Sequence, residues 1–144
     1  MTLTFNINKP IDFVFDYLSD MQKFVSVHPI IYKIENKGNN NYLVYEKLKL
    51  LFIPVSFTYP AHVEENKETN QIIINAVVKK MTRIQMNFVL DNINGQTKIT
   101  ETIDFKSALP IKFIMQKIFR KQHTDLFKNI ETLSEKKTGL NKNN

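Results

Sequence analysis

The sequence predicts an α+β fold, in which strands run in succession through the middle of the chain and a long helix ends it. Three observations predict this fold. From Ile30 to Lys106, apolar and polar residues alternate with the period of two that is typical of half-buried strands. The connections between the alternating segments are short, which favours antiparallel hairpins because parallel neighbours need long crossovers. Beyond Leu109, apolar residues recur three and four positions apart, as they do on one face of a helix.

The start of the chain predicts one strand followed by two short helices. Residues 2–7 alternate in polarity and form the expected first strand. Asn8 is placed to cap a helix over residues 11–18, since its side chain can accept a hydrogen bond from the first turn. A second helix over residues 21–27 should end before Pro29, because proline disfavours helical geometry in the residue preceding it.

Six further strands and one long helix are predicted after Pro29. The strands are expected at residues 30–36, 41–50, 55–64, 71–79, 82–91 and 96–106. The last helical pattern runs over residues 109–134, and a helix of about 24 residues within it would be roughly 36 Å long at 1.5 Å per residue. We therefore expect one domain over residues 1–134 and a flexible tail over residues 135–144.

Composition agrees with one folded domain. The 144 residues are 42% hydrophobic and 24% charged, which is ordinary for a globular protein. The chain has no cysteine, which excludes disulfides and thiolate chemistry. The first residues lack the pattern of a signal peptide, and no segment reaches the roughly 18 apolar residues of a membrane span. We expect a cytoplasmic protein without an integral membrane segment.

The net charge of +6 does not predict a nucleic-acid partner. Residues 134–144 hold three lysines and one glutamate and so contribute two of these charges. The other basic residues form only isolated pairs, such as Lys79-Lys80 and Arg120-Lys121, without the clustered basic stripe of a nucleic-acid binder.

Sequence motifs for cofactors and metals are missing. The chain has three glycines and neither a G-x-S-x-G elbow, a phosphate-binding loop nor a dinucleotide fingerprint, so we expect no cofactor. The three histidines, His28, His62 and His123, lie far apart in the sequence and lack the short spacing of metal ligands. We therefore predict no metal site.

The order of the predicted elements resembles that of the START-like, or SRPBCC, superfamily, which includes Bet v 1-like pollen allergens and polyketide cyclases. The segment 11–20, the helix-ending His28-Pro29, the stretch 95–101 and the long terminal helix carry the resemblance, which covers nearly the whole chain. It implies a helix-grip fold, in which a seven-stranded antiparallel sheet wraps around the last helix and leaves a hydrophobic cavity. Members bind lipids, sterols or other apolar ligands; some catalyse cyclisations, and others serve co-chaperone or toxin functions.

Glu101 is the most informative residue for a site in such a cavity. It shares one strand face with Thr97, Ile99, Ile103 and Phe105. A carboxylate on a buried face is costly unless it is paired or hydrogen-bonded. Glu101 therefore contacts a ligand, acts as an acid or base, or meets a basic side chain of the terminal helix. The alternatives are that this face opens to solvent or that Glu101 forms a fixed ion pair, which would be structural.

Several other side chains are ambiguous. Tyr59 could offer its hydroxyl to a ligand, although buried tyrosines usually bind a protein neighbour. Tyr45 and Glu46 lie on opposite faces of one strand, so only one of them can face the cavity. His123 could reach the cavity rim or be structural. The apolar segment 48–55 could cover the cavity mouth or touch a membrane, but a buried corner is the favoured interpretation.

The leading functional hypothesis is binding of a small hydrophobic molecule, a lipid or an aromatic metabolite, between the sheet and the last helix. The expected lining residues are Tyr59, Phe88, Glu101, Phe113, Met115, Phe119 and His123. One alternative is a polyketide cyclase/dehydratase-like or hydrolase-like enzyme, with Glu101 as acid or base assisted by Tyr59 or His123. Another is an interaction module without a ligand, whose basic surface meets an acidic partner. The sequence leaves the oligomeric state open.

Overall fold

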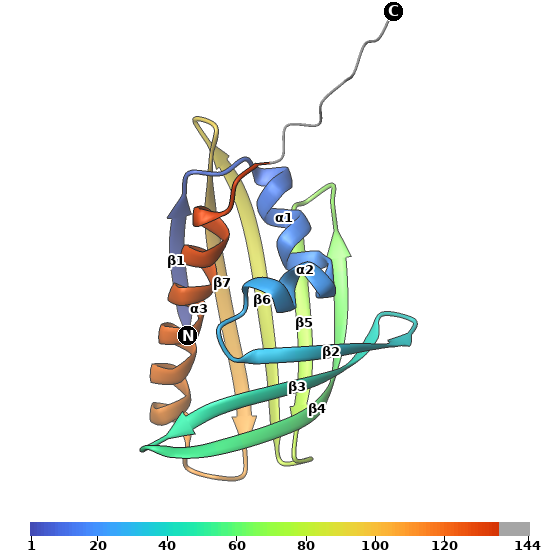
Figure 1. Cartoon of the computed structure of the whole chain (residues 1–144), viewed down its shortest axis with the longest axis vertical. Coiled ribbons are helices and arrows are strands. Elements are labelled where there is room, and N and C mark those ends of the chain that lie inside the picture. Colours follow the sequence, from blue (N-terminus) through green and yellow to red (C-terminus); the bar gives the residue numbers. More distant parts are fainter. Residues whose placement is uncertain (136–144) are drawn as a thin grey trace, which may run out of the picture.

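A computed structural model describes residues 1–135 and confirms the predicted class and element order (Figure 1). One strand is followed by two short helices, six strands and a long helix. The elements are β1 (Thr2–Ile7), α1 (Ile11–Ser19), α2 (Met21–Val27), β2 (Ile31–Gly38), β3 (Asn41–Leu50), β4 (Ile53–Asn66), β5 (Gln71–Val78), β6 (Thr82–Ile93), β7 (Gln96–Ser107) and α3 (Lys112–Thr132).

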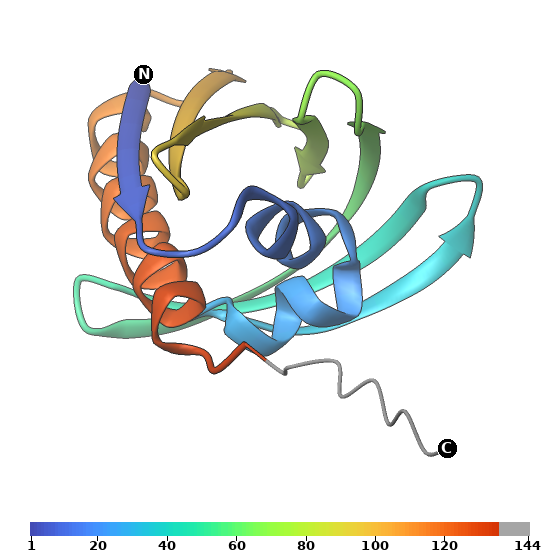
Figure 2. The same cartoon turned by 90° about the horizontal axis from the view of Figure 1, so that it is seen from above.

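The seven strands form one antiparallel sheet in the order β1-β7-β6-β5-β4-β3-β2. Successive hairpins build the sheet from β2 to β7, and β1 then pairs with β7, for example at Leu3 opposite Glu101. Figure 2 shows that the sheet curves strongly, with α1 and α2 inside the curve at one end and α3 along its open side. This arrangement is the helix-grip fold that the resemblance implied.

The two short helices begin and end for identifiable local reasons. Pro10 occupies the N-cap position of α1 without a side-chain cap, so the predicted capping by Asn8 is wrong. The backbone N–H of Asn8 instead donates to Glu131 Oε1 at 2.8 Å, which ties the start of α1 to the end of α3. The Asp20 side chain caps α2 by accepting from two backbone N–H groups. Helix α2 ends at Val27, with His28 as its C-cap before Pro29, as predicted.

Helix α3 is slightly shorter than predicted at both ends, and its two halves differ in burial. From Phe119 onward the helix presents a buried stripe to the core: Phe119, His123, Leu126, Phe127 and Ile130. The first turns are more open, and Phe113 is 81% exposed. The core therefore lies between the sheet, α1 and α2, and the C-terminal half of α3.

The apolar segment 48–55 is not a buried corner, so that interpretation is wrong. Leu51 and Phe52 form a two-residue turn between paired Leu50 and Ile53, and they are 87% and 96% exposed. The physical reason lies in the pairing of β4, which meets β5 only from Ala61 onward. The earlier part of β4 pairs only with β3, so this hairpin extends beyond the rest of the sheet as a two-stranded arm.

The predicted flexible tail, residues 135–144, lies outside the described residues apart from Glu135. Within residues 1–135, no helix combines the length and apolar character needed to cross a bilayer.

Candidate functional site

The inner face of the sheet changes from closed to open along the strands. On β4, Ala61 and Val63 are buried, whereas Phe57 and Tyr59 on the same face are partly exposed. The same change occurs on β7, between buried Ile103 and partly exposed Phe105. Helices α1 and α2 fill the closed end, and none of the described helices fills the other. We call the latter the open end, and water reaches apolar side chains of the inner face there.

Glu101 and His123 meet in the interior between these two ends. The Glu101 carboxylate is fully buried, and its Oε1 lies 2.6 Å from Nδ1 of His123. The two atoms are close but lack the alignment of a hydrogen bond, and neither Glu101 oxygen has a hydrogen-bond partner among the described residues. At this distance one of the two atoms must carry a hydrogen, because two bare acceptors would repel each other. The contact is therefore an electrostatic pair in a site with little water to stabilise it.

His28 stands beside this pair and stays neutral. Its ring lies 6.2 Å from that of His123, edge to face, and 5.1 Å from that of Phe24. Its Nδ1 accepts from the backbone N–H of Ile31 at 3.1 Å and, more weakly, of Ile30 at 3.4 Å, so the ring proton is on Nε2. Burial, assisted by the nearby charge of His123, lowers the pKa of His28 from 6.5 to about 3.

Glu46 and Tyr59 form a second polar pair on the inner face, nearer the open end. The Tyr59 hydroxyl donates to Glu46 Oε2 at 2.7 Å. Burial raises the pKa of Glu46, while the hydrogen bond from Tyr59 and the charge of His123 oppose the increase. Burial also raises the pKa of Tyr59 well above its usual value, with the Glu46 charge adding to the effect. At neutral pH the pair is a phenol that donates to a half-buried carboxyl group.

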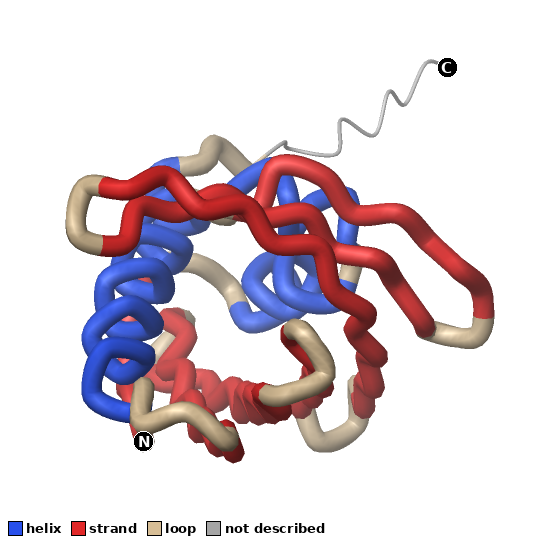
Figure 3. The backbone as a smooth tube through the Cα atoms, turned by 90° about the horizontal axis from the view of Figure 1, so that it is seen from below, coloured by secondary structure: helices blue, strands red, loops and turns tan. Residues whose placement is uncertain are grey.

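Exposed apolar side chains surround the open end. We call them the apolar rim: Leu51, Phe52, Ile53, Met81, Leu109, Phe113 and Ile114. They come from the β3–β4 turn, the β5–β6 turn, the loop after β7 and the first turn of α3, which Figure 3 shows around one end of the molecule. The Lys79 ammonium lies 5.3 Å from the centre of the Phe57 ring at the same end. Singly exposed apolar residues are common, but several at one end of a molecule indicate a binding or entry surface.

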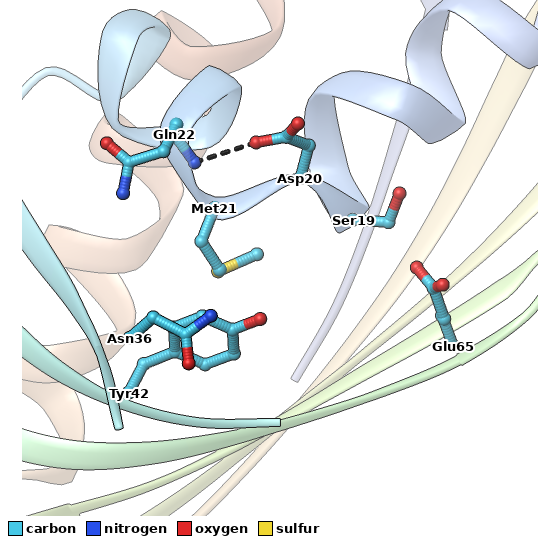
Figure 4. A pocket seen from close by; sticks show the side chains of 7 residues that line it. All are labelled: Ser19, Asp20, Met21, Gln22, Asn36, Tyr42 and Glu65. Atoms are coloured by element: carbon cyan, nitrogen blue, oxygen red, sulfur yellow. Dashed lines mark hydrogen bonds between the residues drawn. The ribbon is translucent and has the colours of Figure 1, made fainter. Parts of the chain in front are cut away.

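A separate surface pocket lies at the junction of α1 and α2 (Figure 4). Its volume is about 290 Å³, and it is lined by Ser19, Asp20, Met21, Gln22, Asn36, Tyr42 and Glu65. The Asp20 carboxylate already accepts hydrogen bonds as the cap of α2, and Glu65 lies across the pocket from it. The polar lining is explained by local structure, so we assign no ligand to this pocket.

The structure distributes the predicted lining residues over three environments. Glu101 and His123 are brought together, with the rings of Phe88 and Phe119 at 6.1 and 5.5 Å from His123. Tyr59 pairs with Glu46 rather than with Glu101. Met115 is partly exposed at the open end, and Phe113 belongs to the apolar rim.

The sequence did not identify Glu46 and His28 as polar groups of the interior. The sequence left open whether Tyr45 or Glu46 faces inward. Glu46 does, whereas Tyr45 donates to Glu35 Oε1 at 3.2 Å on the other face. Alternation with buried Val44 was the available signal for Glu46. Within residues 1–135, no group of three or more histidine and acidic side chains is arranged to hold a metal ion.

The curved antiparallel sheet, the two short helices after its first strand and the gripped terminal helix define a START-like (SRPBCC) protein. A START superfamily protein from Mycobacterium smegmatis superimposes with a TM-score of 0.74 at 14% identity, over 93% of this chain and 98% of that one. A conserved protein from Geobacillus kaustophilus gives 0.75 at 14%, over 90% and 91%. The Zhui aromatase/cyclase from Streptomyces sp. R1128 gives 0.65 at 11%, over 90% and 89%. These similarities show the fold alone.

The family is more specific. The family of CoxG, which is described as a subunit of carbon monoxide dehydrogenase, matches residues 4–134, and the chain belongs to this family. No curated protein sequence matches the chain.

Proposed function

We propose that the protein binds a small hydrophobic ligand between the inner face of the sheet and α3, entering at the open end. The observation that carries this proposal is the partial exposure of inner-face side chains that should otherwise be core. Met86, Phe105 and Met115 pack against the core and Phe57 shares the inner face of β4 with buried Ala61, yet water reaches all four. Covering this apolar surface with a ligand would stabilise the complex by about 25 cal/mol per Å² of apolar area removed from water.

The apolar rim supports the same proposal. An apolar ligand leaving water meets apolar side chains before it reaches the interior, so entry needs no passage across a polar surface. The same fold occurs in a protein described as an aromatase/cyclase, a name that implies a small organic substrate for that protein.

A catalytic role for Glu101 has less support. Its carboxylate pairs with His123, an arrangement that suits acid–base chemistry. However, Glu101 has no exposed surface, and the Tyr59 hydroxyl that was expected to assist it is bonded to Glu46. Binding is therefore the function that the geometry supports best.

The test is native mass spectrometry of the purified protein, followed by titration with the neutral fluorescent probe N-phenyl-1-naphthylamine. A variant that fills the proposed space, Met115→Trp, should weaken probe binding. The matched control is Lys117→Trp, which adds the same side chain at an exposed position of the same helix. A wild-type protein that carries no apolar molecule and binds no probe would contradict the proposal.

A further inference from the structure

The polar groups of the proposed site lie at its inner end. Glu46 and Tyr59 are both half-buried, and they stand between buried Val44 and Ala61 on one side and partly exposed Phe57 on the other. From Tyr59 to Ile53 in the apolar rim, β4 extends about 20 Å at about 3.3 Å per residue. Apolar residues face inward along most of this distance. A bound amphiphile therefore meets a polar group at the inner end of the site and apolar groups near its mouth.

The free hydrogen-bonding capacity of this polar pair is that of an acceptor. Tyr59 uses its one hydroxyl hydrogen on Glu46 Oε2. Among the described residues, no group donates to Glu46 Oε1. Where Glu46 is ionised, its free oxygen Oε1 accepts hydrogen bonds and donates none. Glu46 Oε1 is not among the buried polar atoms that lack a partner, so water reaches it, and a donor supplied by a ligand would take the place of that water.

The charges around the pair also disfavour an anionic ligand. Glu101 is a second interior carboxylate, and His28 is neutral. Of the buried charged and polar side chains within residues 1–135, none is a lysine or arginine; they are Thr82, Thr97, Glu101 and His123. A ligand carboxylate at the inner end would face two carboxylates with only His123 to compensate. A hydroxyl or ammonium group would face acceptors.

We propose that the ligand is an amphiphile that enters with its polar end first and carries a hydrogen-bond donor, a hydroxyl or an ammonium group. The donor bonds to Glu46 Oε1, and the apolar part extends past Phe57 and Met115 to the apolar rim. Fatty-acid carboxylates are rejected at this position. This inference rests on the proposed function, which requires only that an apolar ligand binds.

The experiment compares three probes with the same alkyl chain: dodecan-1-ol, dodecylammonium and dodecanoate. Each displaces N-phenyl-1-naphthylamine from the full-length protein below its micelle concentration. We expect the alcohol and the ammonium to bind at least about tenfold more tightly than dodecanoate, since hydrogen bonds to charged groups are stronger than those between neutral groups. The net charge of +6 would by itself favour dodecanoate, so unspecific attraction predicts the opposite order.

Two variants test whether the Glu46–Tyr59 pair causes the preference for the alcohol and the ammonium over dodecanoate. Glu46→Gln replaces the acceptor by an amide that also donates, and should reduce the preference to less than about threefold. Tyr59→Phe keeps the carboxylate and frees Oε2 as a second acceptor, so it should keep or increase the preference. It is the second variant if Glu46→Gln fails to fold by circular dichroism, and loss of the preference in Tyr59→Phe would contradict the assignment to Glu46. The control is Glu64→Gln, on the outer face of β4, which should bind all three probes as the wild type does.

The possible outcomes separate the two proposals. If N-phenyl-1-naphthylamine and all three probes fail to bind, the proposed function is wrong. If the probes bind with equal affinity, the ligand site exists but the selection of a donor is wrong. Tightest binding of dodecanoate would overturn the inference in favour of the reverse orientation, with the carboxylate at the mouth near Lys79. An unchanged preference in Glu46→Gln would also overturn it.

Discussion

Glu101 has no exposed surface and stands on a strand face whose other buried members are Thr97, Ile99 and Ile103. Among the described residues, its close charged partner is His123, at 2.6 Å. Loss of one partner of a buried pair leaves the other charged group without compensation, whereas loss of both leaves an apolar space that side chains can fill. The energetic value of the pair should thus depend on whether one or both residues are replaced.

Replacement of Glu101 by alanine is expected to lower the free energy of unfolding by about 3–5 kcal/mol. The double variant Glu101→Leu/His123→Leu should cost less than the two single leucine variants added together. Urea denaturation of these variants and the wild type measures both effects. The control Glu64→Ala, at an exposed position, should change the stability by less than about 0.5 kcal/mol. Additive costs in the double variant would contradict a coupled pair.

His28 makes stability depend on pH in a defined direction. Its pKa is about 3 in the folded protein and 6.5 ordinarily, so between these values the unfolded chain binds a proton that the folded protein does not. The contribution of neutral His28 is complete above pH 6.5 and is lost as the pH falls toward about 3. Below that pH both states are protonated and the loss ends.

The variant His28→Asn should therefore show a flatter pH dependence than the wild type between pH 6.5 and 3. We expect the difference in unfolding free energy between the two proteins to change by at most about 1.4 kcal/mol per pH unit. Denaturation at a series of pH values measures it, and His62→Asn, on the exposed outer face, is the control. Parallel curves for His28→Asn and wild type would show that His28 titrates normally in the fold.

Two hairpins of the sheet have turns with similar backbone conformations but different residue types. Asn94 and Gly95 connect β6 to β7 with φ values of 53° and 83°, which asparagine and glycine tolerate well. Leu51 and Phe52 connect β3 to β4 with φ values of 48° and 73°, in a region that is unfavourable for both side chains. The β3–β4 turn thus combines backbone strain with exposed apolar side chains. Such strain is typical of residues that serve binding rather than stability.

The double variant Leu51→Asn/Phe52→Gly should consequently raise the free energy of unfolding by about 1 kcal/mol, because it relieves left-handed backbone strain. The variant should also bind N-phenyl-1-naphthylamine more weakly or exchange the bound probe more slowly, since part of the apolar rim is lost. Asn94→Gly, in the turn that already suits its backbone, serves as the control and should change stability by only a few tenths of a kcal/mol. A loss of stability in the Asn-Gly variant would contradict the strain that we assign to this turn.

At the scale of the whole molecule, the fold could be predicted because its signals are local and repeat along the chain. Alternation placed the strands, and Pro29 placed the end of α2. The site was less predictable because it depends on distant contacts. That Glu101 meets His123 follows from how α3 lies along the curved sheet, and that β3 and β4 extend as an arm follows from where β5 stops pairing. Neither is encoded in a local pattern.

The route of entry can be tested because the chain has no cysteine. A single introduced cysteine can be coupled to a bulky maleimide-polyethylene glycol at one chosen position. Labelled Phe113→Cys, in the apolar rim, should slow both association and dissociation of N-phenyl-1-naphthylamine several-fold relative to the same variant without the label, and the label should leave the equilibrium affinity nearly unchanged. The reason is that an obstacle at the mouth alters passage in both directions and leaves the bound state as it was.

Two further positions make the experiment decisive. Labelled Glu64→Cys, on the outer face of the sheet, should have the kinetics of the unlabelled protein. Labelled Asn36→Cys lies at the surface pocket between the short helices and β2, which is the other conceivable entrance. Stopped-flow fluorescence then distinguishes the two routes: slowing at Phe113→Cys alone supports entry through the open end, whereas slowing at Asn36→Cys alone would place the entrance beside α1 and α2.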